Sequence, residues 1–320
     1  MRALICDGPG QSPRLSDIPA PSPGPGEVAL RIRACGLNFA DLLMLDGTYQ
    51  DTPATPFTMG LELAGEVTSL GPGTTGPAPG TRVAVFSGQG GLAEAGVFPA
   101  DRCLPIPDAM PWADAAAFQI AYGTSHLALS HRARLQPQET LLVLGAAGGV
   151  GLTAVEIGKR MGARVIASAR GPDRLEVARA AGADHLIDSD APDLRDRLRD
   201  LGGVDVCYDA VGGPAFDAAL RAMRPEGRML AIGFASGKVP QVPANILLVK
   251  NLTVTGLYWG GYLRFAPHVL AHSLMTLLEW YGRGHLHPHI SHTLPLDRAT
   301  EALTLLRDRR ATGKVVVTMD

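Results

Sequence analysis

The seven residues Gly145 to Gly151 have the most specific chemistry in this sequence. They are Gly-Ala-Ala-Gly-Gly-Val-Gly and follow the apolar stretch 141–144. In the frame Ala146-x-Gly148-x-x-Gly151, the middle glycine lets backbone N–H groups approach a pyrophosphate at the positive N-terminus of a helix, and the last allows close strand packing. The pattern predicts a dinucleotide-binding turn. The residues predicted to contact the cofactor are Ala146, Ala147, Gly148, Gly149 and Val150.

The end of the next predicted strand, residues 164–168, bears on which dinucleotide is bound. An NAD enzyme usually places Asp or Glu here to hold the ribose 2′-hydroxyl, whereas this sequence has Ser168, Arg170 and Arg174. A hydroxyl and two guanidinium groups are suitable donors for a 2′-phosphate, so we predict NADPH as the cofactor. The alternative is that both arginines are solvated residues at the start of a helix.

The scaffold for these residues follows from a change in sequence pattern near Asp114. Before it, short stretches that alternate, such as Val28, Leu30 and Ile32, lie between Pro- and Gly-rich turns and predict a small β-rich domain. After it, strand, glycine turn and helix alternate at the spacing of right-handed βαβ units on a parallel sheet. The predicted segments are 141–144, 149–161, 164–168, 172–181, 185–187, 193–201, 204–209, 214–223, 228–232 and 252–257.

The tail after Trp259 predicts a helix around Leu270 to Leu278, a His-rich strand, a helix near 297–309 and a last strand, 314–318. A tail that follows a completed sheet can return to the first domain. We therefore predict an α/β fold with a doubly wound parallel sheet and a β-rich catalytic domain. The predicted boundaries are 1–118 and 260–320 for a discontinuous catalytic domain and 119–259 for the nucleotide-binding domain.

Length and composition exclude several classes of protein. A chain of 320 residues is about twice the usual size of one domain. The net charge of −2, with neither sign concentrated in one segment, argues against a nucleic-acid or anionic-membrane partner. The longest uncharged stretch is shorter than a membrane span, and the N-terminus has no apolar signal segment, so we expect a cytoplasmic protein. The four cysteines are far apart and predict neither disulfides nor a zinc knuckle.

Taken together, the motifs resemble the medium-chain dehydrogenase/reductase superfamily, and in particular its zinc-free quinone oxidoreductase (zeta-crystallin-like) branch. The resemblance covers essentially the whole chain. It implies a GroES-like catalytic domain, a Rossmann domain, a cofactor cleft between them and a homodimer. The motifs that carry it, besides the glycine turn, are residues 35–41, 46–49, 60–65, 250–251, 256–260 and 312–316.

The resemblance also implies the roles of individual residues. Asn38 and Tyr49 are the polar groups that face the acceptor, where an amide and a phenol can donate hydrogen bonds to its oxygen. The alternatives from the residues alone are that Asn38 caps a helix that starts near Phe39 and that Tyr49 is an aromatic residue of a turn. Further cofactor contacts implied by the family, for which core packing is the alternative, are Thr124, Gly233, Phe234, Ala235, Tyr258, Trp259 and Gly260.

The positions that correspond to zinc ligands favour a metal-free enzyme. Zinc-dependent relatives have a Cys where Asn38 stands and a His where Leu61 stands, and neither an amide nor a leucine replaces those ligands. His285, His287 and His289 have the spacing of one strand face and could suggest a metal site. We favour solvated or packed histidines, because Pro288 interrupts the run and no fourth ligand is evident.

Three functions follow as hypotheses. The first is transfer of hydride from NADPH to a quinone, because an acceptor that no metal polarises must take hydride readily. The second is an NADPH-dependent reductase of enones or enoyl thioesters on the same scaffold. The third, a cofactor-binding protein with a structural or RNA-binding use, is disfavoured by the intact cofactor turn and the near-neutral charge.

Overall fold

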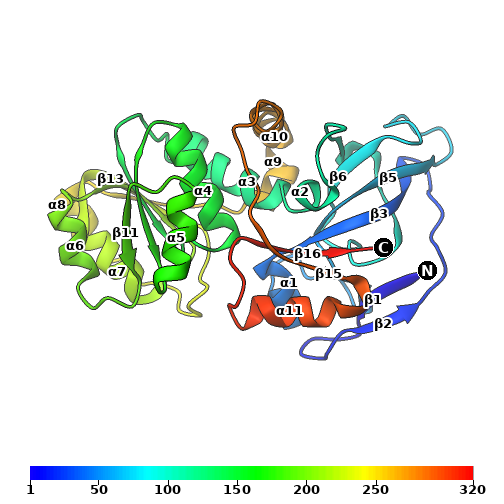
Figure 1. Ribbon diagram of the computed structural model, residues 1–320, viewed down its shortest axis with the longest axis horizontal. Coiled ribbons are helices and arrows are strands. Elements are labelled where there is room, and N and C mark those ends of the chain that lie inside the picture. The colour runs from blue at the N-terminus through cyan, green and yellow to red at the C-terminus, as the bar shows by residue number, and fades with distance from the viewer. Residues whose placement is uncertain (320) are drawn as a thin grey trace. The chain divides into compact units, whose positions relative to one another are not determined.

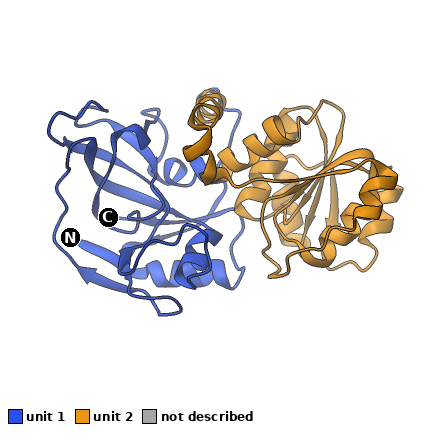
Figure 2. Cartoon of the chain, turned by 180° about the vertical axis from the view of Figure 1, so that it is seen from behind, with its two compact units in different colours: residues 1–120, 282–320 blue, residues 121–281 orange. Residues whose placement is uncertain are grey.

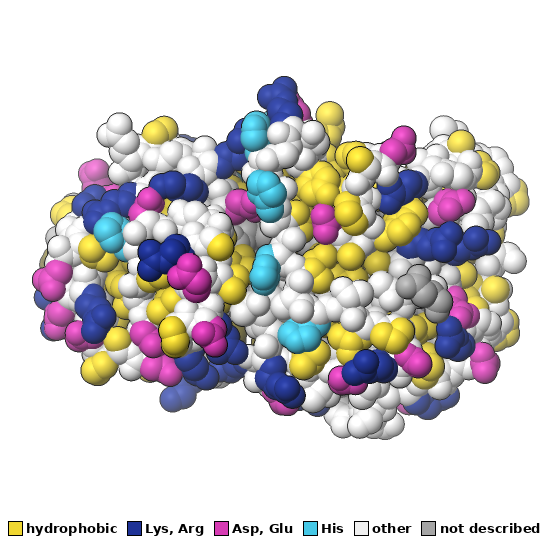
Figure 3. Space-filling view, viewed as in Figure 1, with side chains coloured by type: hydrophobic (Ala, Val, Ile, Leu, Met, Phe, Trp, Pro, Cys, Tyr) yellow, Lys and Arg dark blue, Asp and Glu magenta, His cyan; other side chains and the backbone are white. Residues whose placement is uncertain are grey.

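The computed structural model describes residues 1–319, which form two compact units (Figure 2). The first unit comprises residues 1–120 and 282–319, and the second comprises residues 121–281. No helix within the described part of the chain is both long and apolar enough to span a membrane. Positive and negative side chains are interspersed over the face shown in Figure 3, as the near-neutral net charge leads one to expect.

The first unit is built on two β-sheets. The larger sheet has the order β15-β16-β3-β5-β6-β8, with β7 paired to β3, and the smaller has the order β2-β1-β4. The strands are β1 (Arg2–Cys6), β2 (Arg14–Asp17), β3 (Glu27–Leu37), β4 (Phe57–Thr58), β5 (Glu62–Leu70), β6 (Arg82–Phe86), β7 (Ala95–Pro99), β8 (Cys103–Pro105), β15 (Ile290–Pro295) and β16 (Lys314–Thr318). The helices are α1 (Phe39–Leu45), α2 (Trp112–Ala116) and α11 (Ala299–Arg307).

Strand β3 is the centre of this unit, and its sequence explains why. Val28, Leu30 and Ile32 alternate with more exposed residues, and all three are buried, as the period-2 pattern predicts. Strand β3 pairs with β5, β7 and β16, and β16 comes from the far end of the chain. In the structure, the segment from residue 282 onward lies in the first unit, where β16 pairs with β3.

The second unit is a doubly wound sheet with the order β11-β10-β9-β12-β13-β14, in which all neighbouring strands are parallel. Helices α4 and α5 lie on one side of the sheet and α6, α7 and α8 on the other (Figure 1). The strands are β9 (Thr140–Leu144), β10 (Arg164–Ala169), β11 (His185–Asp188), β12 (Val204–Asp209), β13 (Met223–Ala231) and β14 (Thr253–Gly256). The helices are α3 (Gln119–His126), α4 (Gly149–Arg160), α5 (Pro172–Ala180), α6 (Leu194–Asp200), α7 (Gly213–Ala222), α8 (Ala244–Lys250), α9 (Tyr262–Phe265) and α10 (Pro267–Gly282).

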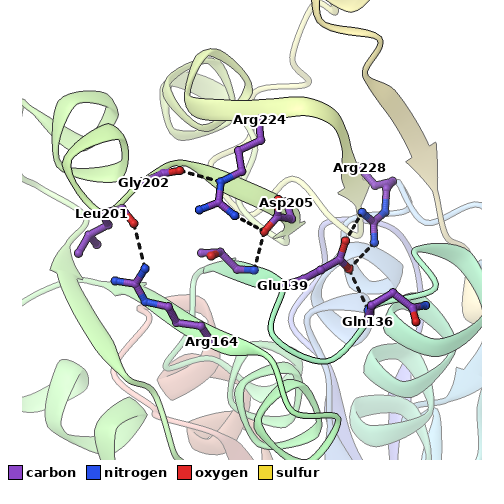
Figure 4. A network of polar contacts seen from close by, with 9 residues as sticks. Gln136, Glu139, Arg164, Leu201, Gly202, Asp205, Arg224 and Arg228 are labelled. Atoms are coloured by element: carbon purple, nitrogen blue, oxygen red, sulfur yellow. Dashed lines mark hydrogen bonds and ion pairs between the residues drawn. The ribbon is translucent and has the colours of Figure 1, made fainter.

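A polar network fixes the amino ends of these strands (Figure 4). The Asp205 carboxylate accepts hydrogen bonds from the Thr140 backbone N–H and from Arg224, both at 2.7 Å. Arg228 forms a bidentate pair with Glu139, with N···O distances of 2.7 and 2.6 Å. Because the network joins the starts of β9 and β12 to β13, it holds the central strands in line at the edge opposite to their carboxyl ends.

The boundary at the C-terminal side of the second unit differs from the predicted one. Residues 260–281, assigned above to the catalytic domain, belong to the second unit. The reason is packing of α10: Ser273 hydrogen-bonds His126 on α3 at 2.8 Å, and the Trp280 ring meets the His126 ring edge-on. Arg160 at the end of α4 lies over the same indole, 4.5 Å from its centroid.

Candidate functional site

The turn between β9 and α4 leaves the start of a twelve-residue helix open to solvent. Gly145 has a positive backbone angle, φ +73°, which favours glycine, and Gly148 is the N-cap of the helix. A Cβ on Gly151 would collide with the backbone carbonyl of Gly145, so only glycine allows this close approach. Gly148 is exposed, and Val150 is partly so. The residues present therefore fit an anionic group held at the helix N-terminus.

The backbone donors in this turn are not all available to a ligand. The N–H groups of Gly145 and Ala146 both donate to the Ser168 carbonyl at 3.0 Å, and the Gly148 N–H donates to the Gly145 carbonyl. The side chains of Ala146 and Ala147 are buried. The N–H groups of Gly149 and Val150 belong to the first helical turn, where no intrahelical partner exists.

The residues around the end of β10 include acidic side chains that the prediction of NADPH did not consider. Ser168 is buried, whereas the Arg170 side chain is exposed and forms an ion pair of 3.3 Å with Asp190. The carboxylate of Asp188, the last residue of β11, accepts the Gly171 N–H at 3.4 Å. The sequence offers no acid at the end of β10 itself. Two acids of the neighbouring strand end are nevertheless beside it, which the parallel order of strands could have indicated.

Asp209 is a second residue that sequence reasoning missed. Its buried carboxylate, at the end of β12, accepts the N–H groups of Val211 at 2.8 Å and Gly212 at 2.9 Å. Its carbonyl accepts the N–H groups of Ile232 and Gly233. Burial raises the pKa of this carboxyl, and the two N–H donors partly oppose the shift. Asp209 thus shapes the loop that carries the predicted cofactor residues.

That loop and two neighbouring segments contain the remaining predicted cofactor contacts. Phe234 is 40% exposed, while Gly233 and Ala235 are partly buried. Thr124 on α3 is buried, and a Cβ on the preceding residue, Gly123, would meet the Trp259 indole at 2.6 Å. Trp259 is itself buried, between partly exposed Tyr258 and Gly260. The structure gives Trp259 a packing role against α3, and the predicted cofactor contacts stay predictions.

In the first unit, Asn38 is part of a buried polar network. Its amide nitrogen donates to the Glu62 carboxylate at 3.0 Å and to the Gly36 carbonyl at 3.2 Å. Its amide oxygen accepts a hydrogen bond from the Lys314 ammonium at 2.7 Å, and that ammonium also contacts Glu62 at 2.7 Å. Both amide protons therefore have acceptors within the protein. A hydrogen bond from Asn38 to a bound acceptor, which stays a prediction, requires exchange of one of these bonds.

Asn38 is also the N-cap of α1, the alternative considered from sequence. Its backbone N–H donates to the carboxylate of Asp41 at 2.8 Å, three residues later in the first turn. Asp41 is buried, and this burial raises its pKa to about 7, against the Asn38 N–H and the Lys314 charge, which lower it. The helix start thus contains a carboxyl group that titrates near neutrality.

Tyr49 lies in the turn that follows α1, so that it and Asn38 flank this helix at its two ends. Its backbone carbonyl accepts the Thr52 hydroxyl at 2.7 Å, and its ring packs partly buried against the core of the first unit. Both groups predicted to face the acceptor therefore depend on one short helix for their positions.

The positions that correspond to zinc ligands contain no ligand set. Leu61 is buried in the apolar core of the first unit, beside the network that Asn38 enters. Among residues 1–319, no three His, Cys, Asp or Glu side chains are grouped so that they could hold a metal ion. The predicted His-rich strand is wrong in its extent, because β15 begins at Ile290, after His285, His287 and His289. Pro288 and Gly284 in this segment disfavour regular strand pairing.

Comparisons with known proteins agree with this architecture. The chain matches the family models for an alcohol dehydrogenase GroES-like domain over residues 24–108 and a zinc-binding dehydrogenase over residues 149–277. It is 38% identical to the quinone oxidoreductase-like protein 2 homolog of Nematostella vectensis, over 99% of this chain and 88% of that protein.

Solved structures give the same result. The quinone oxidoreductase of Thermus thermophilus, described also in complex with NADPH, matches with a TM-score of 0.89 and 34% identity, covering all of both chains. A structure described as an NAD-dependent alcohol dehydrogenase matches with a TM-score of 0.91 and 29% identity, also over all of both chains. Fold similarity alone therefore does not distinguish the two nicotinamide cofactors.

The fold and site define an oxidoreductase with a Rossmann unit and a GroES-like unit, as predicted. The chain belongs to the zinc-free quinone oxidoreductase branch of the medium-chain dehydrogenase/reductase superfamily.

The close approach at the glycine turn predicts unequal effects of two glycine substitutions. Gly151→Ala should lower the free energy of unfolding by about 1–3 kcal/mol, because its Cβ forces α4 away from the turn. Gly148→Ala is the control: its Cβ meets its nearest atom at 3.4 Å, and its φ of −82 suits alanine. Urea unfolding of both variants without cofactor measures the difference, and equal losses would contradict the packing described here.

The buried carboxyl of Asp41 predicts how stability depends on pH. Its pKa is raised to about 7 in the folded state from 3.8, so the folded protein binds more protons than the unfolded chain between these values. The stability due to this group is therefore complete below about pH 4 and is lost as the pH rises through 7. Asp41→Asn should flatten the decline between about pH 4 and 7 in urea unfolding. A variant with the same decline as the parent protein would show that Asp41 does not titrate in this range.

Proposed function

We propose that the protein transfers hydride from NADPH to a quinone and does so without zinc. The observation that carries the proposal is the open helix start after the glycine turn, which fits a dinucleotide pyrophosphate. The quinone and the NADPH named for the Thermus thermophilus relative support the choice of substrate and cofactor. A catalytic role for zinc has no support in the residues at positions 38 and 61, an amide and a buried leucine.

When bound, the cofactor supplies the hydride, and the chain's own residues position the reactants. The first turn of α4 would hold the pyrophosphate, and Asp209 would hold the loop at Gly233. Tyr49 would donate a hydrogen bond to the acceptor oxygen as it gains charge. Asn38 would act mainly by fixing the start of α1, because both of its amide protons are already bound within the protein.

A screen of acceptors tests the reaction directly. With chelator present, the purified protein should oxidise NADPH with quinones, with kcat/KM higher for NADPH than for NADH. Deuterium-labelled cofactor separates quinone reduction from reduction of enones or enoyl thioesters, since only the latter place deuterium on carbon. Saturated products that carry deuterium on carbon, together with inactivity toward quinones, would replace the proposal by an enone reductase. Loss of activity in chelator, with one zinc per chain by elemental analysis, would refute the metal-free reaction.

Substitutions at the two ends of α1 should separate catalysis from structure. Tyr49→Phe should lower kcat by about tenfold with a smaller change in KM, because a donor to the developing charge is lost. Asn38→Ala should lower kcat and also the melting temperature, because Glu62 and Lys314 lose a partner in a buried network. Full kcat in Tyr49→Phe would exclude this tyrosine as the donor.

The homodimer implied by the family resemblance and the cytoplasmic location expected from the sequence remain proposals. Strand β14 is an edge strand of the sheet in the second unit, and Leu248 and Val249 on α8 have 78% and 75% of their surfaces exposed. An unpaired strand edge with nearby apolar side chains suits association with a second copy of the chain.

A further inference from the structure

The ends of β10 and β11 bring one basic and two acidic side chains together. These parallel strands pair with Ala169 opposite Asp188, so the residues that follow each strand emerge at the same edge of the sheet. Arg170 follows β10, and its guanidinium forms an ion pair of 3.3 Å with Asp190, which follows β11. Both side chains are exposed, at 58% and 63%.

The backbone around this pair is held by the second carboxylate. Asp188 accepts the N–H of Asp190 at 3.0 Å and the N–H of Gly171 at 3.4 Å. Gly171 is the N-cap of α5, and its N–H would otherwise be open to an anion. Asp188 therefore fixes Asp190 in the position from which it faces Arg170.

This arrangement matters for a cofactor with a 2′-phosphate. In doubly wound sheets, ligands bind at the carboxyl ends of the strands, and the end of the second strand lies at the adenosine ribose. A phosphate that uses Arg170 must displace the Asp190 carboxylate or lie beside it. The exposed ion pair is weak and can open, but the negative charge of Asp190 remains close and repels the phosphate. A 2′-hydroxyl has no such conflict.

We propose that Asp190 restrains the preference of this enzyme for NADPH over NADH by pairing with Arg170. The inference rests on the proposed use of NADPH. It makes cofactor selectivity a property of the Arg170–Asp190 pair, with Arg170 attracting the phosphate and Asp190 opposing it. The wild-type chain then binds both cofactors, with a modest advantage for NADPH.

Binding measurements on single and double variants test this inference. Dissociation constants for NADPH and NADH are measured by calorimetry at low and high salt. Asp190→Asn should tighten NADPH about threefold or more, the scale of one exposed charge, and change NADH less than about twofold. The gain should shrink in the Arg170→Ala background and at high salt, which screens exposed charges.

A matched control is available on the neighbouring helix. Glu176→Gln removes the same charge from another exposed pair, with Arg179 on α5 at 3.1 Å, and should leave both dissociation constants unchanged. The inference is overturned, while the proposed function stands, if Asp190→Asn leaves the affinity for NADPH unchanged or increases the affinity for both cofactors equally. A wild-type chain that binds neither cofactor would overturn the proposed function and this inference with it.

Discussion

The contact between Gly151 and the carbonyl of Gly145 limits how the second unit can be built. Helix α4 can follow β9 so closely only because no side chain lies between them. The Gly145 and Ala146 N–H groups then reach the Ser168 carbonyl, which ties the turn to the end of β10. The open helix start, the ends of the neighbouring strands and the residues that follow them are all positioned by this approach. A larger residue at position 151 would shift the helix and with it the candidate cofactor site.

The first unit depends on a different constraint, the burial of charge. Lys314 and Glu62 are almost fully buried and are 252 residues apart in the chain. Buried charges of this kind must be paired and hydrogen-bonded, and Asn38 and the Ile120 N–H supply the remaining contacts. The network therefore joins β16 to β5 and to the start of α1. Asn38 stands where zinc-dependent relatives have a ligand, and in this protein it hydrogen-bonds to the buried ion pair of Glu62 and Lys314.

These two constraints have different consequences for function. The glycine turn leaves backbone groups open to solvent, where a ligand can use them. In the network around Glu62, the side chains of Asn38, Glu62 and Lys314 hydrogen-bond to one another. These residues therefore act by holding the start of α1 in place. Tyr49 lies beyond the other end of α1 and is positioned by the turn that follows this helix. The second unit thus has backbone donors open to a ligand, and the first has a helix, α1, whose start is hydrogen-bonded to a buried ion pair.

Local sequence determined much of this protein, because several of its signals act over a few residues. The strand, glycine turn and helix from 140 to 160, the spacing of the βαβ units and the alternation in β3 could all be predicted, since each depends on backbone sterics or on which face is buried. The tertiary structure decided what distant segments do to one another. It paired Asn38 with Lys314, placed Asp190 beside Arg170, and assigned α10 to the second unit through Ser273 and Trp280. Such contacts join residues that are separated along the chain, and the order and register of whole strands and helices determine them.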